Sequence, residues 1–509
     1  SWELQAGYPI IHVSFSSGQF QIAQQRFRTN KDDIGNDLSS WYIPLNFATA
    51  SNPNFEDTTI TNYFVNGQDL AMISAPPQFD ATQWFVFNKQ QLGYYRVNYD
   101  FENWHALIVA LNSDDFDQIH VLNRAQLVDD AINFAAGGYL DYNVVFGILG
   151  YLVRETEHTP WYSADRFINT LYTTFGPLNE HLNVSLLNLF VPRLQIIFMN
   201  FFFQTFVRYL SQEFYDKYKA PSNFIIPNES VYERYGRELS MKLACNSGND
   251  QCLYDTFVVN KLISDDEISI RKGLEGVTYC SGFRGYNKQT EWIKMWNRMQ
   301  ASTDSTFRSQ IISGLGCSDD EQVLKDYLES TLGSGNSVSY SQADRRAVVS
   351  SVLNSKSGLE AVITFFKDFE LDILANFGYG SLEAMITVPA RTVKTRDQQL
   401  LFLDYLVGLR QLDSTAYRRV ADIVGNNLAT QQQPLYVQHL ATIKRIVDAI
   451  PEETTTTDAP TTTTTTGSTS TSPGTSSPPV TDTTQGASTI TIKLATLIVS
   501  LFVVFYVKY

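Results

Sequence analysis

The chain has 509 residues, 43% of them hydrophobic and 13% aromatic, which is the composition of a globular protein with room for two or three domains. Its formal net charge is −15 and its sequence pI is about 4.9, so a nucleic-acid partner is disfavoured and an acidic ectodomain is indicated. The chain begins at Ser1 without an initiator methionine or a signal peptide, and we therefore expect it to be the C-terminal part of a longer protein.

The first segment, residues 1–91, has the pattern of β-strands. Residues 10–13 form an apolar run, and residues 41–47 and 83–87 are rich in aromatic and β-branched side chains, with clusters of Asn, Gly and Pro between the runs. This pattern predicts a small β-sandwich. His12 would lie on one of its strands, where a single histidine is far more often satisfied or exposed than a metal ligand.

The octapeptide GYYRVNYD at residues 93–100 separates this segment from the rest of the chain. Its interleaved aromatic and polar side chains suit a last extended segment, and Asp100 suits the N-cap of the first helix. From there the apolar period becomes three to four residues, and similar helical faces recur as far as Pro451. We therefore predict that residues 92–451 are α-helical. One expected face, which Gly137 and Gly138 end, contains Ile119, Leu122, Ala125, Val128, Ile132 and Ala135.

Residues 186–210 are unusually apolar, and a membrane span is one interpretation of them. Arg193 and Arg208 interrupt the stretch, and the uncharged run between them, residues 194–207, is 14 residues long. A span needs about 18–20 residues, so we predict a core helix instead.

The composition changes abruptly after the helical region. Residues 452–487 are rich in Thr, Ser and Pro, which predicts a disordered, O-glycosylated stalk, with a plain linker as the alternative. Residues 488–509 end in 14 apolar residues, 494–507, for which a transmembrane helix, a core strand and a GPI-attachment signal compete. We favour the GPI signal because small residues, a polar spacer and an apolar tail occur in that order, with Gly486 as the attachment site. The spacer is short, and Asp482 or Thr483 is the alternative site.

Four cysteines and two glycosylation sequons are consistent with a secreted protein. Three pairings of Cys245, Cys252, Cys280 and Cys317 are possible, and four free thiols are the alternative. A zinc site is disfavoured because no two cysteines have the Cys-x-x-Cys spacing. The sequons predict N-glycosylation at Asn183 and Asn228.

Several motifs resemble those of the membrane alanyl aminopeptidases, the zinc exopeptidases typified by aminopeptidase N. The octapeptide resembles the junction between the family's third and fourth domains, and the similarity covers about residues 1–450. The other motifs, in chain order, are SW at 1–2, Gln5, GYP at 7–9, WYIPL at 41–45, NRAQL at 123–127, DDA at 129–131, YL at 151–152 and PW at 160–161.

The resemblance implies a fold and a function. It implies that residues 92–451 form a HEAT- or armadillo-like solenoid that caps an active-site cavity, and that the disulfides join Cys245 to Cys252 and Cys280 to Cys317. It implies peptide substrates, a zinc cofactor, and a place on the extracellular face of the plasma membrane. The stalk and GPI signal resemble the gut-surface enzymes of insects, for which bacterial pore-forming toxins are further partners.

No catalytic or zinc-binding residue is predicted in this chain. The family's zinc site needs a His-Glu-x-x-His helix, and none of the six histidines is followed by Glu or lies four residues from another. Zinc would therefore be bound by a domain absent from this chain. Asp129 and Asp130 lie in mid-helix, where one of them is expected to face solvent, and for Arg124 we favour a structural ion pair over a substrate contact.

Two functions of different classes are compatible with these observations. In the first, the chain is the C-terminal portion of a GPI-anchored zinc aminopeptidase and supplies the helical cap and the membrane tether. In the second, it is a non-catalytic cell-surface protein that binds peptides or serves as a receptor. We favour the first, because the chain starts inside a recognised motif without a signal peptide.

Overall fold

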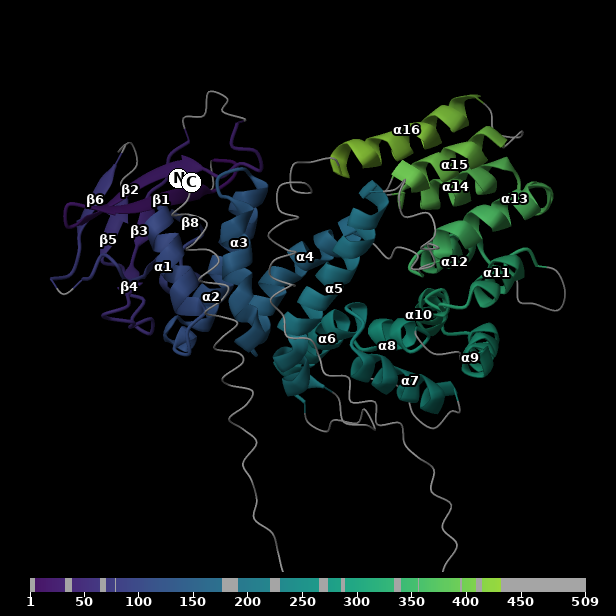
Figure 1. Cartoon of the computed structure of the whole chain (residues 1–509), viewed down its shortest axis with the longest axis horizontal. Helices are drawn as coiled ribbons and strands as arrows, with labels where there is room; N and C mark the ends of the chain where they lie inside the picture. The colour runs from purple at the N-terminus through teal and green to yellow at the C-terminus, as the bar shows by residue number, and fades with distance from the viewer. Residues whose placement is uncertain are drawn as a thin grey trace, which may run out of the picture.

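The computed structural model describes residues 5–32, 39–64, 70–77, 79–175, 191–219, 229–264, 273–284, 289–333, 340–355, 357–393, 396–408 and 414–431. A small β region packs against the first helices, and the remaining helices form a curved stack (Figure 1). The predicted fold class, a small β region followed by a mainly α-helical chain, is confirmed.

The β region contains one larger sheet and two strand pairs. The four-stranded sheet has the order β6-β2-β1-β8, in which β1 and β2 are antiparallel and register Pro9 with Arg26. The two pairs, β3 with β5 and β4 with β7, are also antiparallel. The strands are β1 (Pro9–Ser16), β2 (Gln19–Arg26), β3 (Ile43–Leu45), β4 (Phe47–Thr49), β5 (Asn62–Phe64), β6 (Ala71–Ser74), β7 (Phe85–Phe87) and β8 (Arg96–Tyr99).

Phe20 joins the large sheet to the β4–β7 pair. Its fully buried ring lies 5.0 Å from the ring of Phe47 and 5.4 Å from that of Phe87, both in edge-to-face geometry. Such contacts between the inner faces of two sheets are the core of a sandwich, and aromatic pairs contribute about 0.5–1.5 kcal/mol beyond the burial of their area.

The strand-to-helix transition lies at Asp100. Strand β8 pairs in parallel with β1, so the β region includes the extended segment that the octapeptide predicts. Asp100 is the N-cap of α1, and its Oδ1 accepts from the Asn103 N–H at 2.9 Å. Its Oδ2 accepts from the Phe15 N–H at 3.0 Å, so one carboxylate both starts the helix and binds β1.

The described α-helices lie between residues 101 and 431. Short 3-10 turns occur at Lys89–Gln91, before the first of them, and at Phe116–Gln118 and Gly150–Arg154. The α-helices are α1 (Phe101–Leu111), α2 (Val121–Ala136), α3 (Tyr142–Leu149), α4 (His158–Phe175), α5 (Val191–Tyr218), α6 (Val231–Asn246), α7 (Asp250–Ser264), α8 (Glu275–Ser281), α9 (Gln289–Ala301), α10 (Ser305–Leu315), α11 (Glu321–Ser330), α12 (Gln342–Val352), α13 (Gly358–Phe377), α14 (Tyr379–Ala390), α15 (Arg396–Gly408) and α16 (Ser414–Gln431).

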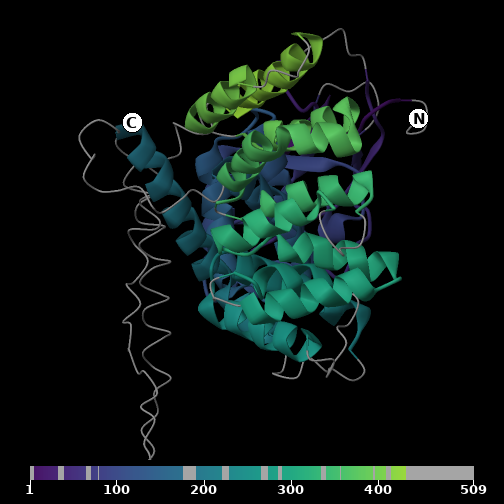
Figure 2. The same cartoon turned by 90° about the vertical axis from the view of Figure 1, so that its right-hand side faces the viewer.

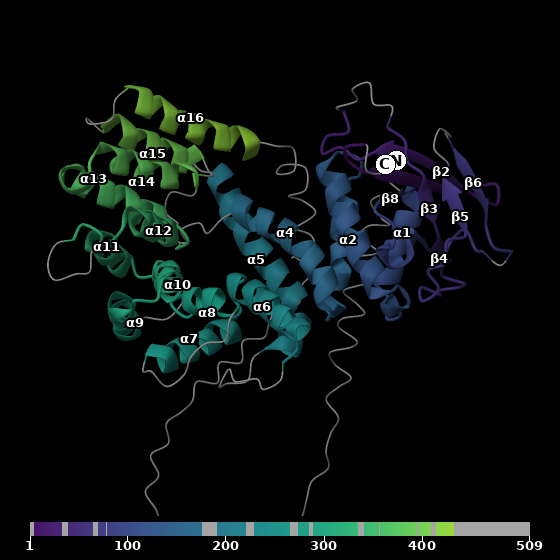
Figure 3. The ribbon, with the colours of Figure 1, turned by 180° about the vertical axis from the view of Figure 1, so that it is seen from behind.

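From α6 onward the helices form two layers. Each of α6, α8, α10, α12, α14 and α16 packs on the next, while α7 packs on α9 and α11 on α13. Helices α8, α10 and α12 lie on the inner side of the curve, and α7, α9 and α11 lie on the outer side (Figures 1 and 3). Seen from the side, the helices are stacked one above another, from teal at the bottom to yellow-green at the top (Figure 2). This is the architecture of a helical solenoid.

Helix α5 contains the described part of the unusually apolar stretch. Phe203, Phe206, Val207 and Leu210 are buried in the core that the β region shares with α1–α6. Among the described helices, none is long and apolar enough to cross a membrane. The stretch is therefore helical from residue 191, and its described side chains at 203–210 include the buried ones of the predicted core helix. The stalk at 452–487, the tail at 488–509 and the expected helix end at Pro451 lie outside the described residues.

Candidate functional site

The recognised motifs converge on a polar junction between the β region and α2. Arg96, on β8, places Nη1 2.6 Å from Asp129 Oδ2 and 2.7 Å from Asp130 Oδ1. Asp130 Oδ2 also accepts from the Val97 N–H at 3.0 Å. The Asp130 side chain is 2% exposed and that of Asp129 is 40% exposed, so one member of the acidic pair does lie nearer to solvent, as expected. Both carboxylates nevertheless bind the same cation.

The charges at this junction shift each other's proton affinity. Burial raises the pKa of Asp130 to about 6, and the Asp129 charge adds to this effect, whereas the Arg96 charge opposes it. Burial by itself lowers the pKa of Arg96, but the two carboxylates outweigh it and keep the guanidinium charged. Because Asp130 binds both the Arg96 guanidinium and the Val97 N–H, the arrangement joins the β region to α2.

A second buried ion pair joins α2 to the turn after α3. Arg124 Nε lies 2.6 Å from Glu155 Oε2, and Nη2 donates to Oε1 at 3.2 Å. The Tyr151 hydroxyl donates to the same carboxylate at 3.2 Å, and Trp161 Nε1 donates to the Glu155 carbonyl at 2.7 Å. The expected structural ion pair of Arg124 is therefore present. Sequence reasoning missed Glu155, although three of the recognised motifs contact it.

The prediction of an apolar face on α2 was only partly right. Ala125, Val128 and Ala135 are buried, but Leu122 and Ile132 are partly exposed, and Ile119 precedes the helix. Polar side chains share the buried surface with apolar ones, namely Asn123, Arg124, Gln126 and Asp130. Asn123 is an example, since its Nδ2 donates to the Asn88 carbonyl at 2.9 Å and its Oδ1 accepts from the Gln90 N–H at 2.7 Å.

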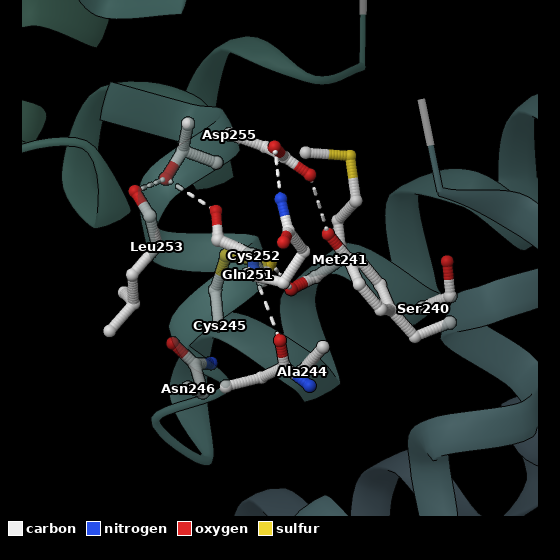
Figure 4. The surroundings of a disulfide bond; sticks show 12 residues. Ser240, Met241, Ala244, Cys245, Asn246, Gln251, Cys252, Leu253 and Asp255 are labelled. Atoms are coloured by element: carbon white, nitrogen blue, oxygen red, sulfur yellow. Dashed lines mark hydrogen bonds between the residues drawn. A yellow bond between two sulfur atoms is a disulfide. The ribbon is translucent and has the colours of Figure 1, made fainter. Parts of the chain in front are cut away.

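The structure joins Cys245 to Cys252 and Cys280 to Cys317, the pairing that the resemblance implies. Cys245 lies near the end of α6 and Cys252 in the first turn of α7, and the Gln251 side chain there points toward Asp255 (Figure 4). The turn between the helices is tight because Gly248 has φ +77° and its N–H donates to the Cys245 carbonyl. Both sulfur atoms of this bond lie in buried residues.

The other predicted modification sites are not among the described residues. Asn183 and Asn228, the two sequon asparagines, and Gly486, the predicted anchor site, all fall outside them. Ser230 of the second sequon is described, and its hydroxyl caps α6 by accepting from the Glu233 N–H at 3.1 Å.

The histidines of the described chain are dispersed. His12 is on β1, His105 is on α1, His120 caps α2, and His158 begins α4 among tyrosine rings. His181 and His439 lie outside the described residues. Within the part of the chain that the structure describes, no three His, Cys, Asp or Glu side chains are grouped to hold a metal ion.

A cavity of about 990 Å³ opens among the inner-layer helices. It is lined by α6, α8 and α10, with contributions from the C-terminal ends of α7 and α9. Its charged lining consists of Glu238, Lys242, Glu275, Arg298 and Asp304, and its aromatic lining of Tyr279 and Phe307.

Burial and neighbouring charge shift the pKa values of two groups in this cavity, Glu238 and Tyr279. Burial raises the pKa of Glu238, and the neighbouring Glu275 charge raises it further. Burial likewise raises the pKa of Tyr279 to about 12, again with a contribution from Glu275. A large pocket with polar and aromatic walls and a perturbed carboxyl group is a candidate binding site. None of its residues had been singled out from the sequence except Cys280, because they come from five separate helices.

Comparison with known proteins decides the family. The family model of the ERAP1-like C-terminal domain matches residues 84–422, which include β8, the polar junction and almost the whole helical stack. The chain belongs to this family. The match begins in the β region and ends within α16, so it includes every residue that lines the cavity.

Curated relatives agree with this assignment. The chain is 30% identical over 402 residues to aminopeptidase N of Plutella xylostella, an alignment that covers 78% of this chain and 39% of the relative. It is 27% identical over 361 residues to membrane alanyl aminopeptidase of Manduca sexta, covering 70% and 34%. It is 27% identical over 380 residues to thyrotropin-releasing hormone-degrading ectoenzyme of Mus musculus, covering 72% and 33%. The chain thus corresponds to a C-terminal part of aminopeptidase N family proteins and spans about a third of the length of these relatives.

Proposed function

We propose that this chain is the C-terminal portion of a zinc-dependent aminopeptidase that removes N-terminal residues from peptides at the cell surface. The observation that carries the proposal is the curved two-layer stack, matched by the family model, with a cavity of about 990 Å³ in its inner layer. A concave wall of this kind limits which peptides reach an enclosed active site. The helical stack would be that wall.

Zinc and the groups that activate its water would belong to another part of the protein. The described residues provide no set of metal ligands, so no step of the reaction is assigned to them. Their part in the proposed function is to bind and select peptides, and to hold the stack rigid through the junction of Arg96 with Asp130 and the pair of Arg124 with Glu155.

The membrane tether is proposed from the sequence of the tail. Residues 452–487 would form the stalk, and residues 488–509 the signal that is replaced by a GPI anchor at Gly486. A phosphatidylinositol-specific phospholipase should release the protein from intact cells. Retention on the membrane after such treatment would contradict the lipid anchor. Toxin partners stay a prediction of the resemblance alone.

The mass of the native protein tests the enzymatic proposal most directly. The protein would be captured from membranes with an antibody to residues 100–431, deglycosylated, weighed, and assayed for zinc and for release of N-terminal residues from a fluorogenic substrate. We expect a mass well above 57.6 kDa, with bound zinc and turnover. A mass near 57.6 kDa without turnover would overturn the proposal and favour the non-catalytic peptide-binding protein.

A further inference from the structure

One short helix, α8, lies between two longer helices in the wall of the cavity. Helix α8 has 7 residues, whereas its neighbours α6 and α10 have 16 and 11. Residues of both longer helices line the cavity together with residues of α8. Tyr279 and Phe307 contribute aromatic surface, and Ile263 and Val277 contribute aliphatic surface. Part of the lining is thus suited to a hydrocarbon chain.

Two carboxylates lie close together in the same cavity. Both face Gly273, whose N–H donates to Glu275 Oε2 at 2.6 Å and whose α-carbon faces Glu238, and both line the cavity. Gly273 leaves room beside this carboxylate, because a Cβ at that position would lie 3.1 Å from Glu238 Oε2, and the glycine has φ +102°. Any other residue there would be strained and would crowd Glu238.

The two cationic side chains that line the cavity, Lys242 and Arg298, already have partners within the protein. Both carboxylate oxygens of Asp165 lie 2.9 Å from Lys242 Nζ. Arg298 donates to the Ile263 carbonyl, and its guanidinium lies 5.7 Å from the centre of the Phe307 ring. The cavity therefore presents no uncommitted positive charge from these two residues to an anionic ligand.

The carboxylates of the cavity have fewer partners within the described protein. Glu275 Oε2 accepts from the Gly273 N–H at 2.6 Å, and Asp304 caps α10 through the Thr306 N–H at 2.8 Å. For Glu238, no hydrogen bond or ion pair within 4 Å joins its carboxylate to the residues that the structure describes, although Arg234 and Lys242 act on it through their charge. Glu238 thus has acceptor capacity for a ligand.

We propose that this cavity binds the side chain of a lysine or arginine in a peptide, with the cationic group between Glu238 and Glu275 and the aliphatic stem against Tyr279 and Phe307. The inference rests on the proposed function, since it names a class of peptide that the inner wall would select. Charge-assisted hydrogen bonds to carboxylates are the strong ones, and a lysine or arginine stem buries readily on an apolar wall.

Direct binding of a peptide that cannot be cleaved tests this inference. Two fluorescent, N-acetylated peptides that differ only in one interior residue, lysine or norleucine, would be titrated into the protein purified from membranes and followed by anisotropy. We expect the lysine peptide to bind at least about tenfold more tightly, which corresponds to one charge-assisted hydrogen bond. Equal affinity of the two peptides, or tighter binding of the norleucine peptide, would overturn the inference without requiring any variant.

Variants of the cavity carboxylates then test whether this site causes the preference for the lysine peptide. Glu238→Gln with Glu275→Gln should remove the preference for lysine, while Glu329→Gln, at an exposed position on outer-layer helix α11, should leave it unchanged. The double variant must lose the preference for lysine and still unfold at the same thermal midpoint as the unaltered protein, which shows that it remains folded. Persistence of the preference in the double variant would place the cation elsewhere and overturn the assignment. Because the assay needs no catalysis, absence of aminopeptidase turnover would count against the proposed function and not against this site.

Discussion

Arg96 and Asp130 join the last strand of the β region to the second helix through an ion pair of 2.7 Å between Nη1 and Oδ1. The Asp130 side chain is almost fully buried, and its second oxygen binds the backbone of the strand that carries Arg96. The contact therefore fixes both the position and the orientation of α2 on the sheet.

Replacing Arg96 by Met should lower the free energy of unfolding by about 3–5 kcal/mol, because the buried Asp130 carboxylate would lose its main partner. The comparison is Lys325→Met, which breaks an exposed pair with Glu321 and should cost no more than about 1 kcal/mol. Urea denaturation followed by circular dichroism measures both. Similar costs for the two variants would show that the junction contributes no more than a surface pair.

The two disulfides should stabilise the protein unequally. The bond between Cys280 and Cys317 spans 37 residues and that between Cys245 and Cys252 spans 7. Because the entropy removed from the unfolded chain grows with loop length, loss of the first bond should cost about 4 kcal/mol and loss of the second about 2 kcal/mol. Paired Cys→Ala variants compared in chemical denaturation test this order, and a larger loss for the short loop would contradict it.

The stability of the β region should depend on pH through His12. Its Nδ1 lies 3.4 Å from Asn98 Nδ2, which can only donate, so the ring is neutral and burial lowers its pKa below the ordinary 6.5. Below pH 6.5 the unfolded chain binds a proton that the folded protein does not. This part of the stability is therefore fully present above pH 6.5 and is lost as the pH falls through the lowered pKa.

His12→Gln should flatten the decline in stability between pH 6.5 and 5, measured as urea midpoints at half-unit steps of pH. Above pH 7 the curves of the variant and of the original protein should run parallel, which serves as the internal control. An unchanged slope between pH 6.5 and 5 would mean that other groups cause the decline.

Close backbone approach at Gly316 should make this position intolerant of a side chain. A Cβ there would lie 2.2 Å from Ser351 Oγ and 2.4 Å from the Ser351 carbonyl carbon, so Gly316→Ala should destabilise the stack by about 1–3 kcal/mol. Gly425, within α16, has no atom within 4 Å of such a Cβ, and Gly425→Ala should instead stabilise by up to about 1 kcal/mol. Thermal unfolding distinguishes the two, and equal midpoints would contradict the packing argument.

The sequence by itself determined the local features of this protein. Asp100 was predicted as an N-cap and is one, because capping needs only a carboxylate two or three residues before unsatisfied N–H groups. The strand around residues 10–13 follows from an apolar run, and the helices from residue 101 follow from a period of three to four residues.

Only the tertiary structure decided which side chains meet. The periodicity of α2 indicated an apolar face that includes Leu122 and Ile132, yet the helix also buries polar side chains. Asn123, Arg124 and Asp130 are buried because their partners lie on distant segments. The parallel pairing of β8 with β1 joins residues 86 positions apart, as Ile10 with Arg96. The cavity likewise combines residues from Glu238 to Gln310. Such contacts depend on how whole elements pack, and no pattern within a few residues of the chain contains that information.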